Sequence, residues 1–254
     1  MSLDITHPGA QLFARYAYAP NELGYCGPAQ SQGLLELGAT GRSASDPHEL
    51  ARRFSGAWPY LRILAELSGI EDPLAEPVVR AYWLGGGLLD RIDPVTFGSR
   101  LLAVIGPQAG HYWAHLTPGL LAEALPNHGF HVFAVYPWSR LLAGPGYRQP
   151  LHVLDRCRIR WGEVLSVEAE HVVVRSRALG WDGEQLGLVA AEPERVRRIT
   201  DGVGFVDDPR PGEWLSLHWD WVCDRLGLAD VADLQECTME QLAATNRRLR
   251  SGPE

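Results

Sequence analysis

Lysine is absent from this 254-residue sequence, in which all 23 basic side chains are arginine. A Schiff base with pyridoxal phosphate needs an amine side chain, and so does the binding of nucleotide phosphates in a P-loop. The missing lysine therefore excludes pyridoxal-dependent enzymes and P-loop ATPases.

Long apolar runs and a cysteine framework are missing as well. No segment is apolar over the length that crosses a bilayer, and the first residues have neither the basic nor the apolar region of a secretion signal. The four cysteines are widely spaced and form no CxxC pair, which indicates reduced thiols. We therefore expect a cytoplasmic protein that does not bind membranes.

Positive charge is also scarce, because the net charge is −8 at pH 7. A nucleic-acid binder gains affinity by neutralising phosphates, so the acidic excess argues against a nucleic-acid partner. Arg156, Arg158 and Arg160 are expected to line one face of a strand. This row leaves an oligonucleotide-binding barrel as the least favoured function.

Helix signals dominate the first half of the chain. Asp46-Pro47, a proline-led segment from Pro94 to Ile105, and Thr117-Pro118 through Leu125 each place proline at a helix start. Apolar residues at helical spacing predict a further helix from Ala57 to Leu67. In contrast, Phe130 to Tyr136 (FHVFAVY) is apolar on both faces and rich in β-formers, which predicts a buried strand.

Glycine and proline concentrate between Ala143 and Pro150, and the periodicity then changes from helical to strand-like. Four short strands separated by turns follow, and a polar helix runs from about Val231 to Arg250. The sequence therefore predicts an α+β protein. A mostly helical domain would cover residues 1–146, and a small β-barrel with a C-terminal helix would cover residues 151–254.

The strand WLSLHW, Trp214 to Trp219, carries the first candidate site residue. Strand alternation places Trp214, Ser216 and His218 on one face, and we expect a helix directly after this strand. His218 is a candidate ligand, although an isolated histidine on such a face is more often a hydrogen-bonded surface residue.

Two cysteines are further candidates. Cys157 shares strand parity with Ile159 and Trp161, so a buried structural thiol and a metal ligand are equal alternatives. Cys26 precedes a helix expected to begin near Pro28, whose N-terminal partial charge would lower the thiol pKa and produce a reactive thiolate. The alternative for Cys26 is a turn cysteine packed beneath its loop.

Four histidines form a third group. His111 and His115 are four residues apart, and His128 and His131 follow. The spacing lacks the glutamate of the HExxH motif, which excludes a zinc protease. Metal binding by His115, His128 and His131 is retained as a less favoured alternative to aromatic packing.

A longer pattern in the second half resembles a known family. The segment CRIRWGEV from Cys157, a valine-rich strand from Val172, a strand at Leu186 to Val189 and the segment DPRPGEWLSLH ending at His218 resemble the HypC/HupF family of [NiFe]-hydrogenase maturation chaperones. The resemblance covers about Cys157 to Leu242. The first half resembles an uncharacterised bacterial family associated with hydrogenase gene sets.

The resemblance implies an OB-like barrel that holds an iron carrying carbonyl and cyanide ligands. Such a protein works with a maturation scaffold protein and delivers the iron group to the hydrogenase large subunit. The family's iron-binding cysteine and histidine correspond to Cys157 and His218, both of which are suitable iron ligands. Cys157 is internal here, whereas the family's cysteine follows the initiator methionine, and Trp219-Asp220-Trp221 replaces the family's glycine-phenylalanine-alanine.

An enzyme is the alternative from another class. Cys26 would be its nucleophile or metal ligand, and His115, His128 or His131 its base, with the barrel serving only as scaffold. Under that hypothesis the active site lies in the first half of the chain.

Overall fold

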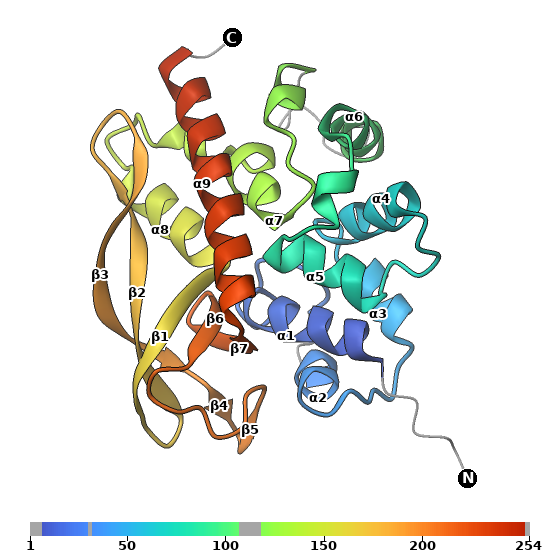
Figure 1. The fold of residues 1–254 in the computed structure, drawn as a ribbon, viewed down its shortest axis with the longest axis vertical. Helices are drawn as coiled ribbons and strands as arrows, with labels where there is room; N and C mark the ends of the chain where they lie inside the picture. The colour runs from blue at the N-terminus through green and yellow to red at the C-terminus, as the bar shows by residue number, and fades with distance from the viewer. Residues whose placement is uncertain (1–6, 30–31, 107–117, 252–254) are drawn as a thin grey trace.

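The computed structural model describes residues 7–29, 32–106 and 118–251, which form an α+β fold (Figure 1). The helical elements are α1 (Pro8–Glu22), α2 (Gln32–Thr40), α3 (Pro47–Arg52), α4 (Trp58–Ser68), α5 (Glu76–Leu84), η1 (Leu89–Arg91), α6 (Pro94–Ile105), η4 (Pro118–Glu123), α7 (His128–Phe130), η5 (His131–Val135), η6 (Pro137–Leu141), α8 (Arg148–Cys157) and α9 (Leu228–Ser251). The strands are β1 (Arg160–Val167), β2 (His171–Trp181), β3 (Leu186–Arg197), β4 (Ile199–Thr200), β5 (Val203–Gly204), β6 (Trp214–His218) and β7 (Trp221–Leu226).

Two of the three helix starts predicted from a proline are confirmed, at Pro47 and Pro94. Thr117 of the third lies outside the described residues, and Pro118–Glu123 forms the 3-10 helix η4. Asp46 accepts a hydrogen bond from the His48 backbone N–H, and Asp93 accepts one from the Thr96 N–H at 2.7 Å. Each aspartate satisfies an otherwise unpaired N–H of the first turn, and proline follows at the first helical position. The predicted helix from Ala57 to Leu67 corresponds to α4, which ends at Gly69 in the left-handed conformation.

The buried strand predicted from Phe130 to Tyr136 is wrong in type. This segment is buried, but it is helical: α7 continues into η5, a π-helix. A short run that is apolar on both faces fits a buried helix as well as a buried strand, so its periodicity does not distinguish the two. Single π turns are frequent at functional sites, and this one carries His131.

Five strands of the second half pair in the closed order β1-β2-β3-β7-β6, and β4 with β5 forms a separate two-stranded sheet. The pairs are antiparallel except for β3 with β7, where Arg197 lies opposite Trp221 in a parallel arrangement. Valine and leucine side chains, most of them from these five strands, form a buried hydrophobic cluster that includes Val164, Val174 and Leu215.

Two expectations near this sheet are wrong. Cys157 is the last residue of α8 and precedes β1, so it does not belong to the strand parity of Ile159 and Trp161. His218 is followed by a tight turn and the strand β7, and the C-terminal helix begins only at Leu228. The turn is possible because Trp219 adopts a left-handed backbone conformation, with φ of 54°.

Helix α9 lies between the helical part and the five-stranded sheet and contacts elements of both (Figure 1). The main hydrophobic cluster also includes side chains from both parts, such as Tyr16 and Trp83 from the first and Trp219 and Cys223 from the second. Packing thus brings residues distant in sequence to one place. Within the described ranges, no helix combines the length and the apolar character that bilayer crossing requires.

Candidate functional site

A cavity of about 240 Å³ lies between α1, α5, α7, α8 and the end of β6. Its walls are mostly aromatic and apolar. Five of the six candidate residues line it: Cys26, His128, His131, Cys157 and His218. The sixth, His115, lies outside the described residues. The residues assigned from sequence to two competing functions therefore share one site.

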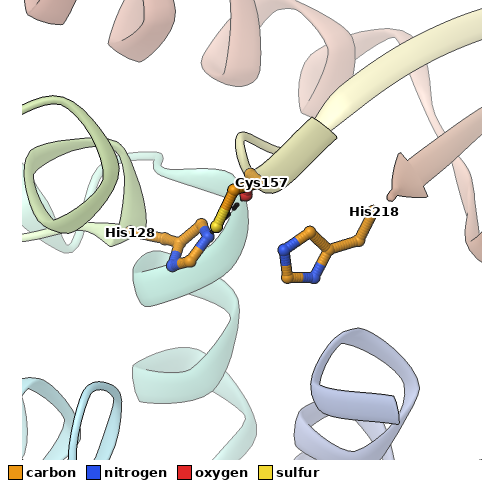
Figure 2. Close-up of side chains that lie close together, drawn as sticks. All are labelled: His128, Cys157 and His218. Atoms are coloured by element: carbon orange, nitrogen blue, oxygen red, sulfur yellow. Dashed lines mark hydrogen bonds between the residues drawn. The ribbon is translucent and has the colours of Figure 1, made fainter. Parts of the chain in front are cut away.

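His128, Cys157 and His218 form the centre of this site. Their side chains offer two imidazole nitrogens and one sulfur, and these three atoms all lie within 4.8 Å of one another. Figure 2 shows His128 and Cys157 side by side, with His218 facing them from the other side. Thiolate and imidazole groups at this separation are a plausible ligand set for a transition metal.

His218 is buried with 1% of its surface exposed, which rules out the alternative of a surface histidine. Its Nδ1 lies 2.7 Å from the backbone carbonyl of Tyr16 in α1. A carbonyl only accepts, so Nδ1 carries the proton and Nε2 carries a lone pair. Nε2 is buried and has no hydrogen-bond partner among the described residues. Metal-bound histidines commonly have this arrangement, in which one ring nitrogen binds the metal and the other donates to a backbone carbonyl.

His128 is fixed on both of its nitrogens. Nε2 donates to the Cys157 carbonyl at 2.8 Å, and Nδ1 lies 3.2 Å from the Tyr82 hydroxyl, which therefore donates to it. The nitrogen bound to the carbonyl lies on the side of the ring nearer to Cys157 and His218 (Figure 2). A metal at this nitrogen would replace the carbonyl, and Nδ1 would then donate to Tyr82.

Burial keeps the histidines of the cavity neutral. Desolvation lowers the pKa of His128 to about 4 and the pKa values of His131 and His218 to about 3. Neutral imidazole is the form that binds metals. All three rings are therefore ready to ligate at neutral pH without losing a proton.

Burial acts on the thiols in the opposite direction. It raises the pKa of the half-buried Cys157 well above the ordinary value, and the neighbouring Cys26 adds to this shift. Desolvation raises the pKa of Cys26 to about 12. The expected lowering of the Cys26 pKa by a helix terminus is therefore wrong, because the described part of α2 begins only at Gln32 and the thiol is surrounded by apolar groups.

The loop carrying Cys26 is anchored to the end of α1. The Asn21 side chain donates to the carbonyls of Cys26 and Pro28, and the Tyr25 N–H donates to the Pro20 carbonyl. Tyr25 is 51% exposed, and its ring stacks on Trp219 at a centroid distance of 4.2 Å. Cys26 is therefore a fixed wall residue next to a stacked pair of rings, of which Tyr25 is half-exposed and Trp219 is buried.

The predicted row of arginines is wrong, since Arg156 belongs to α8. Arg156 and Arg160 both pair with Glu194, and Arg158 pairs with Asp155 at 3.0 Å. These three guanidinium groups are half-buried or buried, and each forms an ion pair with a carboxylate of the same chain.

Sequence patterns did not identify Tyr16, Tyr82 and Trp83 as parts of the site. Trp83 packs against the rings of His128 and His218 at 4.7 and 5.7 Å, and Tyr16 stacks on Trp83 at 5.4 Å. The sequence shows only that they lie in helices rich in aromatic residues, a pattern that is equally typical of an ordinary core.

No curated protein and no solved structure shows significant similarity to this chain. One family model matches residues 5–252, which includes the helical part, the five-stranded sheet and α9. All residues of the candidate site lie within that match. The chain therefore belongs to DUF6390, a family of unknown function.

Proposed function

We propose that the protein carries a metal group, an iron with carbonyl and cyanide ligands, and delivers it during [NiFe]-hydrogenase assembly. The iron group is cargo, received with a maturation scaffold protein and passed to the hydrogenase large subunit. Cys157 and His218 hold the iron, and His128 is the third ligand. The observation that carries this proposal is the convergence of these three side chains within 4.8 Å.

The donor types favour a metal of this kind. Thiolate and imidazole bind iron, zinc, copper or nickel, whereas magnesium and calcium prefer oxygen ligands. Among the described residues that line the cavity, none is a carboxylate. The site thus suits a transition metal with nitrogen and sulfur ligands.

The volume and polarity of the cavity favour a metal that brings small ligands of its own. One water occupies only about 10 to 15 Å³ of this kind of space, whereas the cavity measures about 240 Å³. Its aromatic walls offer few partners to water. A metal carrying diatomic ligands would fill more of the space than a bare ion and would need less hydration.

The five-stranded sheet is compatible with the family resemblance. A closed order of five strands is typical of an OB-like barrel, and β6 ends on the histidine that corresponds to the family's ligand. The internal position of Cys157 at the end of α8 means that a thiol, without a terminal amine, is what this residue contributes.

The alternative of an enzyme with Cys26 as nucleophile has one observation in its favour, which is that Cys26 and His131 line the same cavity. The raised pKa of the Cys26 thiol argues against it, since the thiolate is the nucleophile. A metal-dependent enzyme using the central residues would have the same ligands as the carrier.

The test is an infrared spectrum combined with metal analysis, on protein purified without oxygen from cells that assemble a [NiFe]-hydrogenase. We expect iron together with bands in the carbonyl and cyanide region, and their loss in Cys157→Ala. Cys223→Ala removes a buried thiol of β7 that does not line the cavity and serves as control.

Other outcomes reject the carrier. A stoichiometric metal without such bands would favour a metal enzyme built on the same residues. Wild-type hydrogenase maturation in cells whose only copy is Cys157→Ala would contradict the proposal at its main residue. If Cys26→Ala alone abolished the function, the cysteine enzyme would be the better hypothesis.

A further inference from the structure

Two tryptophans that line the cavity have indole N–H groups without a partner. Trp83 is 5% exposed and Trp219 is 4% exposed, and in the part of the chain that the structure describes, Nε1 of each is buried and makes no hydrogen bond. A buried polar group left unpaired destabilises the fold. Such groups are rare in native proteins and call for an explanation, such as a bound ligand.

The backbone of Trp219 shows that its position is enforced. Its φ of 54° lies in the left-handed region, which a bulky residue rarely adopts. Two contacts hold it there: its N–H donates to the Arg156 carbonyl at 2.7 Å, and its carbonyl accepts from Arg160 at 2.5 Å. Strained residues of this kind cluster at ligand-binding sites.

The location of the two rings matches the metal ligands. Trp83 packs against the rings of both His128 and His218, and Trp219 directly follows His218 in the chain. The outer side of Trp219 is covered by Tyr25. Both tryptophans therefore line the same cavity as His128, Cys157 and His218.

The chemistry of these groups selects the partner. An indole N–H only donates, so it binds an acceptor. No carboxylate or arginine is found among the described lining residues, so the charge of an anion in this cavity would be balanced by a metal. Hydrogen bonds to a charged acceptor are also the stronger ones.

We propose that Trp83 and Trp219 bind, through their indole N–H groups, small anionic ligands carried by the metal held on His128, Cys157 and His218. The preferred cargo is then a metal with linear anions that accept hydrogen bonds at their outer end, and not a metal ion with water ligands. This inference rests on the metal site of the proposed function and adds the determinant of which metal group is accepted.

The experiment uses cobalt(II) as the metal and azide as the anion, with the full chain kept without oxygen. Cobalt binding is followed by thiolate-to-metal absorption, and azide is then titrated into the cobalt-loaded protein. We expect Trp83→Phe and Trp219→Phe to bind cobalt like the wild type and azide about tenfold more weakly, as the loss of one hydrogen bond to a charged acceptor predicts.

Trp221→Phe is the matched control. Trp221 also has a buried Nε1 without a partner among the described residues, but it does not line the cavity. Its substitution should leave both affinities unchanged. Equal azide affinity in wild type, Trp83→Phe and Trp219→Phe, with cobalt bound in all of them, would overturn the inference and leave the metal site standing. A wild type that binds no cobalt would overturn the metal site, and the inference with it.

Discussion

His218 has one nitrogen committed to the fold and the other free to bind. The bond from Nδ1 to the Tyr16 carbonyl fixes both the ring and its tautomer. The same bond ties β6 to α1, which is 202 residues away in sequence. The residue therefore contributes to folding and presents a ligand lone pair at the same time.

Proton release on metal binding is the first prediction at this scale. The low pKa values of His128 and His218 mean that both rings are already neutral above about pH 5, whereas the raised pKa of Cys157 means that its thiol is protonated. A metal must displace that single proton. Zinc affinity should therefore rise about tenfold per pH unit between pH 6 and 8.

Calorimetric titration of zinc in buffers of different ionisation enthalpy would count the released protons directly. We expect about one proton per metal in the wild type and close to none in Cys157→Ser, which would also bind more weakly. Cys26→Ser should still release one proton. Release of two or more protons in the wild type would mean that Cys26 is a ligand too.

Cys26 shows what local sequence reasoning captures and what it misses. The sequence identified it as a notable thiol, and it does line the cavity. The expected pKa was wrong because the surrounding apolar side chains, which raise it, come from segments far away in the chain. Desolvation is a property of the assembled site, and no local motif reports it.

At the scale of elements, the sequence predicted correctly the features that depend on neighbouring residues in the chain. It failed for features that depend on contacts with distant segments. The helix starts at Asp46 and Asp93 were predicted because the cap and the proline are adjacent in sequence. The segment from His128 to Val135 was not, since its helical form depends on being buried on all sides. The strand β7 was missed because the turn at Trp219 needs a conformation that tryptophan rarely adopts.

One side chain of helix α9, Asn246, forms two hydrogen bonds with β3. Asn246 accepts from the Leu186 N–H at 2.8 Å and donates to the Leu186 carbonyl at 2.9 Å, as a neighbouring strand would. Both groups of Leu186 are thereby satisfied in a buried environment. This contact holds the β2–β3 hairpin against the helix that also packs on η5.

Asn246→Ala should therefore lower the free energy of unfolding by about 1 to 3 kcal/mol, because it leaves two buried backbone groups unpaired. Urea denaturation followed by far-ultraviolet circular dichroism measures this change. Gln235→Ala, at an exposed position of the same helix, should stay within about 0.5 kcal/mol of the wild type. Equal stability of the two variants would show that water replaces the asparagine without loss.

At the scale of the whole molecule, the site exists only when both parts of the chain are assembled. His128 belongs to the helical part, Cys157 ends α8, and His218 ends β6. The family resemblance paired Cys157 with His218, but the sequence placed His128 in a separate candidate site, because nothing in a single sequence reports its contact with Cys157, 29 residues away. Arg15 with Asp224 and Arg248 with Glu123 add ion pairs between distant segments.

This assembly has a consequence for stability in acid. In the unfolded chain a histidine has a pKa near 6.5, whereas burial lowers the values in the folded protein to about 4 for His128 and about 3 for His131 and His218. Between these values the unfolded chain binds protons that the folded protein does not. The free energy of unfolding should therefore be fully maintained above about pH 6.5 and fall as the pH drops towards 4, by about 1.4 kcal/mol per pH unit for each such histidine.

Carboxylates titrate in the same range, so the informative quantity is the difference between variants. His131→Gln should reduce the slope of unfolding free energy against pH between pH 6 and 4.5 by the contribution of one proton. His152→Gln, at an exposed position of α8 outside the cavity lining, is the variant with which the slope of His131→Gln is compared. Urea unfolding at a series of pH values measures both.

If His131→Gln kept the wild-type slope, His131 would have to take up a proton in the folded state, and the cavity would then be accessible to water rather than dry. In that case it would be a poor site for the proposed cargo.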